Sequence, residues 1–382
     1  MKTPLTPVSK IKNRMLTLLL ILFVWHLSAF TTVPTPAKDQ SIQLAILLDT
    51  SNSMDGLIDQ AKSQLWKIVN ELAVAKCADG QKPAIKIALY EYGNDNLSSA
   101  EGYIRQVSGL TDDLDLISQK LFSLSTRGGN EFCGQVINNS LNQLLWSPSV
   151  NDLKMIFIAG NEPFTQGSFS YRTACSLARE KGVVVNSIFC GGYEEGIRTN
   201  WKDGADITGG TYMSIEQDRK TVYIPSPYDE RISALNDKLN STYVYYGASG
   251  ASKKEMQAVQ DSNAESYGQS NKVERAISKS THAYKNSSWD LVDASKENEK
   301  VIMEAKDEDL PKEMKGMTII QRQAYVKQKA DERIKVQEEI QTLNKKRSEY
   351  IAANTPKGEE NSLDASMMKA VKEKAKQKNL SF

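Results

Sequence analysis

The sequence predicts an α/β fold, a doubly wound and mostly parallel sheet, which is followed by a mainly α-helical C-terminal region. Three observations predict this. Up to Ile215, short apolar runs typical of buried strands alternate with segments of helical period. Such alternation builds a parallel sheet that is covered by helices on both faces. Beyond Ile224 the strand signals nearly vanish, and charged helical segments take their place.

Length and composition narrow the possibilities further. The chain has 382 residues, which fits about two domains. With 48 Lys and Arg against 47 Asp and Glu, its net charge is +1, and this balance argues against a dedicated nucleic-acid binder. Only 2 His and 4 Cys are present, which excludes a histidine-built zinc site. We predict four regions: a signal segment (1–37), the α/β domain (38–222), a mixed helical linker (223–305) and long charged helices (306–382).

The first 37 residues have the pattern of a secretory signal. Basic residues precede an apolar run from Met15 to Phe30, and a helix-breaking polar tail follows it up to Ala37. The run is about 16 residues long, whereas a bilayer-spanning helix needs roughly 20. The segment is therefore either a cleaved signal peptide or an uncleaved signal anchor. Both place the rest of the chain outside the cytoplasm, secreted or periplasmic, where disulfides are allowed.

The elements of the first half follow one another closely. Residues 41–48 are apolar almost throughout, as expected of a strand buried on both faces. Further strands are predicted at 84–92, 103–107, 153–159, 183–189 and 212–215. Helices are predicted between them, with Thr111 as the N-cap of one and Gly182 as the C-cap of another. Three of these helices have an apolar face, and a fourth is predicted at 171–181. The first face consists of Leu57, Ala61, Leu65, Ile68, Val69 and Leu72, the second of Leu114, Ile117, Leu121 and Phe122, and the third of Val136, Ile137, Leu141, Leu144 and Leu145.

A polar loop directly follows the first strand and precedes a helix. It carries Asp49, Ser51 and Ser53. In a doubly wound sheet the first strand is central, and ligands bind at its carboxyl end, where the strand order reverses. One carboxylate and two hydroxyls are hard oxygen ligands suited to Mg²⁺. They leave the ion under-neutralised, so that it would accept an acidic group from a partner. The alternative is that a serine caps the helix and Asp49 interacts with the helix dipole.

The segment from Leu44 to Gly56, LAILLDTSNSMDG, resembles the opening of a von Willebrand factor A (vWA) domain. The loop at Gly128 and Gly129 and the strand end at 158–163 fall where that family has its second and third ion-binding loops. The resemblance covers about residues 40–217. The segments 89–93 (LYEYG) and 159–164 (AGNEPF) are similar to those of a subgroup of uncharacterised bacterial envelope proteins. The resemblance implies a Rossmann-like vWA domain over the first half of the chain.

The resemblance also implies a metal-ion-dependent adhesion site, in which a divalent ion holds a partner protein through the partner's carboxylate. Mg²⁺ is the expected ion, with Mn²⁺ or Ca²⁺ as alternatives. The third loop departs from the family pattern, because Gly160 stands at the position of the usual aspartate and Asn161 or Glu162 would have to reach in. The implied ligands are Asp49, Ser51 and Ser53 from the first loop, Asn130 or Glu131 from the second, and Asn161 from the third.

All four cysteines lie in the first half. In an oxidising compartment we expect one disulfide among Cys133, Cys175 and Cys190, which all lie near the loop end of the sheet, with the pairing left open. Cys77 belongs near the opposite end. A catalytic cysteine would lack a histidine partner, since only His282 remains outside the signal segment. No enzymatic activity is therefore expected.

The second half reads as helices with little apolar content. They are predicted at 229–239, within 253–286 and at 318–353, with an extended insert at 242–250 and a helix break at 355–358. Trp289, Leu291 and Val292 are expected to dock on a neighbouring surface. The long helix has an imperfect apolar stripe, so either a coiled coil or a packed helical hairpin is open. Its mixed charges from Lys327 to Arg333 read as a solvated face.

The function predicted from these features is an extracytoplasmic protein-binding module for adhesion or assembly. It would use the loop face of the α/β domain, assisted by a divalent cation. The partner would be another envelope protein that offers an acidic side chain, with no nucleic acid and with membrane contact only through the N-terminal segment. The alternative is a structural scaffold protein with a vestigial metal site, which assembles through the helical half.

Overall fold

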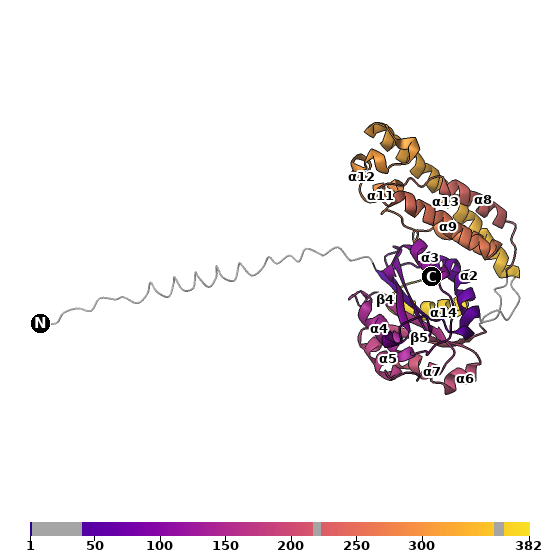
Figure 1. Ribbon diagram of the computed structural model, residues 1–382. Helices are drawn as coiled ribbons and strands as arrows, with labels where there is room; N and C mark the ends of the chain where they lie inside the picture. Colours follow the sequence, from indigo (N-terminus) through magenta and orange to yellow (C-terminus); the bar gives the residue numbers. More distant parts are fainter. Residues whose placement is uncertain (2–39, 217–222, 355–362) are drawn as a thin grey trace. The chain divides into compact units, whose positions relative to one another are not determined.

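The computed structural model describes Met1 and residues 40–216, 223–354 and 363–382. The predicted signal segment and the predicted helix break at 355–358 lie outside the described residues. Gln40–Phe382 form one compact unit, in which a helix-covered sheet is joined to a group of helices (Figure 1). We call the helices from α8 to α13, within 223–354, the helical arm. Among the described residues, none of the helices combines the length and apolarity that a bilayer crossing requires.

The sheet confirms the predicted doubly wound, mostly parallel architecture. Its strand order is β3-β2-β1-β4-β5-β6, and every neighbouring pair is parallel except β2 with the edge strand β3. Because β1 lies between β2 and β4, the strand order reverses at its carboxyl end. The strands are β1 (Ser41–Asp49), β2 (Ala84–Tyr92), β3 (Ile104–Thr111), β4 (Leu153–Gly160), β5 (Val184–Cys190) and β6 (Tyr212–Ile215).

Each face of the sheet supports a separate apolar core. Along β1, Leu44 and Leu48 contribute to one core and Ala45 and Leu47 to the other, as the alternation of side chains along a strand requires. The first core is covered by α2 (Asp55–Leu72), α3 (Leu114–Phe122) and α14 (Leu363–Ala375). The second is covered by α4 (Cys133–Gln143), α5 (Tyr171–Glu180) and α7 (Trp201–Ile207), and the short α6 (Tyr193–Arg198) precedes α7 (Figure 1).

Three local predictions have different outcomes. Helix α3 is capped by Asp113, whose carboxylate accepts a hydrogen bond from the Leu116 amide at 2.9 Å. The predicted cap Thr111 instead ends β3, and its hydroxyl accepts from the Asp113 amide at 3.1 Å. Gly182 follows α5 with φ +66°, the conformation expected at a helix C-terminus. Leu145 was placed on a buried face, but α4 ends before it and its side chain is 93% exposed.

The helical arm contains α8 to α13. Their bounds are α8 (Asp229–Asn240), α9 (Gly250–Ser266), α10 (Gln269–Lys279), α11 (Leu291–Glu297), α12 (Lys300–Glu304) and α13 (Ile319–Asn354). Arg275 of α10 joins the arm to the helices of the sheet. Its guanidinium stacks on the ring of Trp66 in α2, 4.3 Å from the centroid, and forms ion pairs with Asp115 of α3 at 2.7 Å and with Asp261 of α9 at 2.8 Å. Arg275 is 1% exposed, so this junction is a buried polar contact.

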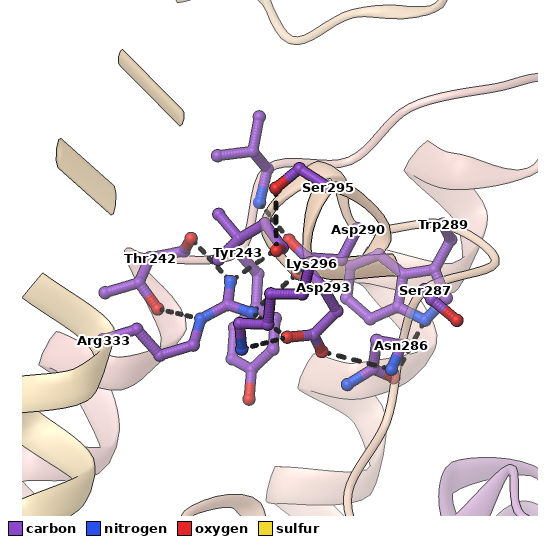
Figure 2. A network of polar contacts seen from close by, with 12 residues as sticks. Thr242, Tyr243, Asn286, Ser287, Trp289, Asp290, Asp293, Ser295, Lys296 and Arg333 are labelled. Atoms are coloured by element: carbon purple, nitrogen blue, oxygen red, sulfur yellow. Dashed lines mark hydrogen bonds and ion pairs between the residues drawn. The ribbon is translucent and has the colours of Figure 1, made fainter. Parts of the chain in front are cut away.

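Helix α13 is held by arginines. Arg333 was predicted on a solvated face, but it is 1% exposed and bonds to Asp290 at 2.7 Å, to Asp293 at 2.9 Å and to the Thr242 carbonyl at 2.7 Å (Figure 2). Its guanidinium also lies 4.1 Å from the centroid of the Tyr243 ring. Buried Arg322 and Arg347 form similar ion pairs on the same helix, with Asp307 and with Asp229 and Glu274. Ion pairs therefore contribute directly to the packing of this helix, which differs from the purely apolar seam of a coiled coil.

The segment that was expected to dock on a neighbouring surface, with Trp289, Leu291 and Val292, is buried, but its side chains pack in two different apolar cores. Trp289 packs in the core that includes the first face of the sheet, and Leu291 and Val292 pack inside the arm with Val326 of α13. Tyr243 stacks on Trp289 with ring centroids 5.8 Å apart. The segment thus connects the base of the arm to its long helix.

The arm leaves and rejoins the sheet at one helix. The buried Gln60 of α2 donates to the carbonyl of Glu216, directly after β6, at 2.8 Å. One turn later, the side-chain oxygen Oε1 of the buried Gln64 accepts from the backbone amide of Asp364, at the start of α14, at 2.8 Å. The sequence grouped α14 with the charged helices of 306–382, whereas its side chains Met367 and Val371 pack in the core of the sheet. The arm is therefore inserted between two parts of one packed layer.

Candidate functional site

The candidate site lies at the carboxyl ends of the central strands. Asp49 is the last residue of β1, and Tyr92, the last residue of β2, is its partner in the parallel register. On the other side, Leu48 pairs with Ala159 of β4, so that Asp49 lies beside Gly160. The Asp49 carboxylate therefore lies at the carboxyl end of a central strand, with β2 on one side and β4 on the other. This is the switch point at which doubly wound sheets bind ligands.

The first loop turns tightly around this carboxylate. The Ser51 amide donates to Asp49 Oδ1 at 2.7 Å, and the hydroxyls of Ser51 and Ser53 lie 3.1 Å apart. The side-chain Nδ2 of Asn161, in the third loop, donates to the Ser53 hydroxyl at 3.1 Å. Ser51 precedes the short 3-10 turn Asn52–Met54 and makes no side-chain cap hydrogen bond to it. The Ser51 hydroxyl is therefore not used as a helix cap.

A second carboxylate, from Glu131, faces Asp49. Asp49 is 0% exposed and Glu131 is 3% exposed. A Cβ atom placed on Gly93 would lie 2.7 Å from Asp49 Oδ1 and 2.8 Å from Glu131 Cγ, so both side chains converge on that glycine. Burial and the adjacent Glu131 raise the pKa of Asp49 well above its usual range, and burial also raises the pKa of Glu131. Ionising both carboxyl groups at once is therefore unfavourable unless a positive charge lies between them.

The third loop is closed at the position where an aspartate would stand. A Cβ atom on Gly160 would lie 2.5 Å from the Tyr92 hydroxyl and 3.1 Å from Asp49 Oδ2. The Tyr92 hydroxyl donates to the Ala159 carbonyl at 3.0 Å and occupies this space. A side chain at position 160 is thus excluded by Tyr92. The negative charge missing from the third loop is supplied by Glu131 of the second.

The structure brings five of the six predicted ligands together. Asp49, Ser51 and Glu131 are buried at the centre, and Ser53 and Asn161 bond to each other at the rim. Asn130 is exposed, so of the two alternatives on the second loop it is Glu131 that points toward Asp49. The Glu131 amide donates to the side-chain oxygen of Gln166, which fixes this orientation.

Two residues that were not predicted as site residues hold the loops in place. Asn94 donates to the Ser125 carbonyl at 2.8 Å and to the Thr50 carbonyl at 3.3 Å, so it ties three loops together. Gly93 has φ +79° and leaves room for both carboxylates. In the sequence, a glycine and an asparagine directly after a strand predict a turn. That this turn holds the other loops in place could not be predicted, because it depends on residues far away in the chain.

The donor set fits a divalent cation. Among the described residues, Asp49 Oδ2 and Glu131 Oε2 are buried and have no hydrogen-bond partner. Two such oxygens, with the hydroxyls of Ser51 and Ser53 and the amide oxygen of Asn161, are hard ligands. The described part of the chain contains no group of three His, Cys, Asp or Glu side chains that could hold a metal. A cation here would therefore depend on hydroxyl and amide oxygens as well as on the two carboxylates.

The predicted disulfide is absent from the described residues. Cys133 and Cys175 are free thiols, and both lie in the core of the second face. Cys190 belongs to the core of the opposite face, so the sheet separates it from the other two. Burial raises the pKa of the Cys133 thiol well above its usual range and that of Cys175 to about 12. Both thiols are therefore protected and unreactive at neutral pH.

A comparison with solved structures found several distantly similar chains. Solved structures with similar folds include the BatB protein from Bacteroides thetaiotaomicron, 17% identical, covering 46% of this chain and 90% of that one with a TM-score of 0.35. Proximal thread matrix protein 1 of the mussel byssus, with zinc in its MIDAS motif, is 16% identical, with 47% and 43% covered and a TM-score of 0.35. The pilus adhesin SpaC from Lactobacillus rhamnosus GG is 12% identical, with 47% and 28% covered and a TM-score of 0.34.

The sequence was also compared with curated proteins and with protein-family models. A search of curated protein sequences found no matching relative. Residues 43–201 match the family model of the von Willebrand factor type A domain. These residues contain all but the first two residues of β1, all of β2 to β5, and all three loops of the candidate site. The match and the observed strand order show that residues 43–201 form a von Willebrand factor type A domain, as the motif around Asp49 predicted.

Proposed function

We propose that this chain is a protein-binding module whose loop face, around Asp49 and Glu131, binds a divalent cation and holds a partner protein. One observation carries the proposal: two adjacent carboxylates are buried at the switch point of the sheet, and one oxygen of each has no hydrogen-bond partner among the described residues. Buried charges are costly unless a counter-charge accompanies them. A cation supplies that counter-charge without moving the strands.

The chain's own residues would hold Mg²⁺ or Mn²⁺ in a defined way. Asp49 and Glu131 would provide the charged oxygens, Ser51 and Ser53 hydroxyl oxygens, and Asn161 an amide oxygen. The bound ion would supply positive charge to the loops and fix their arrangement. Tyr92, which donates to the Ala159 carbonyl, would keep the third loop at its present distance from Asp49. The site would therefore act as a rigid platform for recognition.

Two further parts of the proposal come from the sequence. The apolar run Met15–Phe30, behind a basic segment, supports a location outside the cytoplasm, secreted or periplasmic. The sequence has one histidine, His282, outside the predicted signal segment, so a histidine-activated nucleophile is not expected, and this supports binding without catalysis. A partner among envelope proteins follows from this location.

The proposal is tested by titrating the purified full-length chain with Mg²⁺ and Mn²⁺ in a calorimeter and in thermal unfolding. We expect heat of binding and a rise in the melting temperature, because a ligand that binds only the folded state stabilises it. Asp49→Asn should abolish both signals. The matched control is Asp79→Asn, which removes an exposed carboxylate from the loop that precedes β2, at the opposite edge of the sheet.

The result that overturns the proposal is clear. If the folded wild-type chain gives neither heat nor a thermal shift with either ion, the cation site does not exist. If Asp79→Asn loses the signals together with Asp49→Asn, the ions act elsewhere or non-specifically.

One observation favours the second candidate, a scaffold that assembles through the helical arm. At the start of α13, Ile319 is 49% exposed and Ile320 is 78% exposed, and exposed aliphatic pairs of this kind suit a protein contact. Cross-linking of the native chain in its envelope, followed by mass spectrometry, separates the candidates. Loss of the cross-linked partner in Asp49→Ala supports the loop face, whereas loss in Ile320→Lys alone supports the arm.

A further inference from the structure

The edge of the sheet opposite the candidate site is formed by four segments. Because β1, β2, β4 and β5 are parallel, they all begin at this edge and end at the loop face around Asp49. We call the four segments the amino-end surface. They are residues 73–83 before β2, 144–154 at the start of β4, 179–183 before β5 and 374–382 at the end of α14.

Hydrogen bonds connect the four segments of the amino-end surface. They join the backbones of Lys76 and Ser381 at 2.8 and 2.9 Å, the Lys378 ammonium and the Val150 carbonyl at 2.6 Å, and the Lys154 ammonium and the Lys181 carbonyl at 3.0 Å. Each segment is bonded in this way to at least one other, so their side chains share one face of the molecule.

The amino-end surface is basic, although the net charge of the whole chain is only +1. Its four segments contain eight Lys and Arg side chains and three Asp and Glu side chains, a formal charge of +5. Five of the bases are exposed, and two of the acids. The exposed bases are Lys76, Lys82, Arg179, Lys181 and Lys376, and the exposed acids are Asp79 and Glu180.

The neighbouring elements do not cancel this charge. The turn after β3 adds Asp112 and Asp113 beside the amino-end surface, and the arm adds Lys253, which pairs with Asp113 at 2.7 Å. The arm also adds the exposed Lys285, three residues after His282, whose ring nitrogen lies 3.2 Å from a carbonyl of the amino-end surface. These two acids and two bases balance one another.

Exposed apolar side chains lie on the same surface. They are Leu145, Val150, Val74 and Phe382, which are 93%, 78%, 56% and 40% exposed. Within residues 40–216 and 363–382, the other large apolar side chains with such exposure are Tyr193 and Ile197, both on α6. Basic side chains with aliphatic and aromatic ones between them are the composition of a protein face that lies on an anionic membrane.

The chain enters the fold through this surface. The side-chain amide of Gln40 donates to the carbonyls of Asn151 at 2.7 Å and Lys378 at 2.9 Å, which fixes the start of β1 here. Gln40 lies ten residues after Phe30, where the apolar run of the predicted signal segment ends. Ten residues span at most about 35 Å. If the run lies in a bilayer, the chain therefore holds the amino-end surface closer to the membrane than the loop face.

We propose that the amino-end surface docks on a bilayer that contains anionic lipids, with its Lys and Arg side chains on the headgroups and Leu145 and Val150 among the acyl chains. The loop face then points away from the membrane, where it is open to a partner protein. The inference extends the membrane contact beyond the N-terminal segment, to which the sequence assigned it. It does not depend on the cation site, because that site lies at the opposite edge of the sheet.

The test is co-sedimentation of residues 38–382 with sucrose-loaded vesicles at low ionic strength. These residues contain the whole compact unit Gln40–Phe382 and lack the basic and apolar N-terminal residues, which would bind lipid by themselves. One set of vesicles is phosphatidylcholine, and the other contains equal parts of phosphatidylcholine and phosphatidylglycerol. We expect binding at least about tenfold tighter to the second set, because its surface is anionic.

Two triple variants test the position of the contact. Lys76→Gln/Lys82→Gln/Lys376→Gln removes three exposed charges from the amino-end surface. Each base near an anionic membrane strengthens binding about fivefold, so this variant should bind at least about tenfold more weakly. The matched control removes three exposed lysines of the arm and should bind within about twofold of the unsubstituted chain. The control is Lys238→Gln/Lys335→Gln/Lys345→Gln.

A third variant tests whether the surface meets a bilayer or only negative charge. Leu145→Ser removes a side chain that is almost fully exposed, so the core is not affected. It should bind the anionic vesicles about fivefold more weakly, because apolar area that enters the bilayer strengthens binding together with the charges. Ile320→Ser, on the arm, is the matched control, with a side chain that is 78% exposed, and should bind like the unsubstituted chain.

Three results would overturn the inference. The first is equal binding to the two sets of vesicles, and the second is an equal loss of binding in the two triple variants. The third is unchanged binding of Leu145→Ser while the triple variant of the amino-end surface binds more weakly. The surface would then attract a soluble anionic polymer by charge alone, and not a bilayer.

Discussion

Removing Arg333 should destabilise the helical arm far more than removing an exposed cation from the same helix. In Arg333→Met the side chain keeps its approximate length and loses its charge. Asp290, which is 0% exposed, then loses its bonds to the guanidinium at 2.7 Å and 3.2 Å. Removing one partner of a buried ion pair costs about 3–5 kcal/mol, because the other charge stays buried without compensation. Burial raises the pKa of Asp290 although Arg333 lowers it. Without Arg333, Asp290 can therefore take up a proton, and the loss of stability should lie near the lower end of this range.

The assay is urea unfolding at pH 7, followed by circular dichroism and tryptophan fluorescence. Trp289, whose ring stacks on Tyr243 below the Arg333 guanidinium, reports on this part of the arm. The matched control is Lys327→Met, which breaks an exposed pair with Asp331 at 2.6 Å on the same helix and should cost less than about 1 kcal/mol.

A double variant tests the cause. Arg333→Met/Asp290→Asn leaves no buried charge at this position, so it should be more stable than the sum of the two single variants predicts. If Arg333→Met loses no more free energy of unfolding than Lys327→Met, the buried pairs do not hold α13 in place, and the reasoning fails.

Three further predictions concern pH, the third loop and the cation. Lys279 and Arg275 outweigh the effect of burial and hold the pKa of Asp261 below its usual 3.8, so its contribution is present above that pH and lost as the pH falls through the lower folded value. The stability gap between wild type and Asp261→Asn, measured by urea unfolding, should therefore narrow below about pH 4, and a gap independent of pH would contradict this. Gly160→Ala should cost about 1–3 kcal/mol in urea unfolding, with partial recovery in Gly160→Ala/Tyr92→Phe, because the new Cβ meets the Tyr92 hydroxyl at 2.5 Å. Gly128→Ala, whose nearest contact is 3.5 Å away, is the control, and equal losses in both variants would refute the packing argument. In EDTA, the melting temperature of Asp49→Asn should be no lower than that of wild type, because the substitution removes one of two adjacent buried acidic groups. In Mg²⁺, wild type should have the higher melting temperature, because only wild type binds the ion. If Mg²⁺ does not change which of the two proteins melts higher, the cation site is contradicted.

The sheet could be predicted from the sequence because its signals are local. Residues of β1, β2 and β4 are apolar almost without interruption, and a strand buried on both faces requires this whatever its neighbours are. The first loop was predictable for the same reason, since Asp49, Ser51 and Ser53 lie within five consecutive residues.

The rest depends on residues far apart in the chain. Arg333 reads as solvated until Asp290 and the Thr242 carbonyl, which lie more than 40 residues away, enclose its guanidinium. Likewise, Gly160 reads as a lost ligand, and only the structure shows that Tyr92 fills its place while Glu131 supplies the charge. The burial of a charge is a property of its partners, which periodicity in one segment does not contain.

The insertion of the arm has a consequence for the order in which the protein can fold during synthesis. Gln60 bonds to the chain just before the arm, at Glu216, and Gln64 bonds to it just after the arm, at Asp364. Helix α14 therefore packs on the sheet only after residues 223–354 have been synthesised. At roughly 5–20 residues per second, the ribosome needs on the order of ten seconds for the arm. During this time the first face of the sheet, with Leu44 and Leu48, lacks part of its cover. A chain that terminates within the arm would keep this apolar surface exposed and would be a substrate for chaperones and proteases.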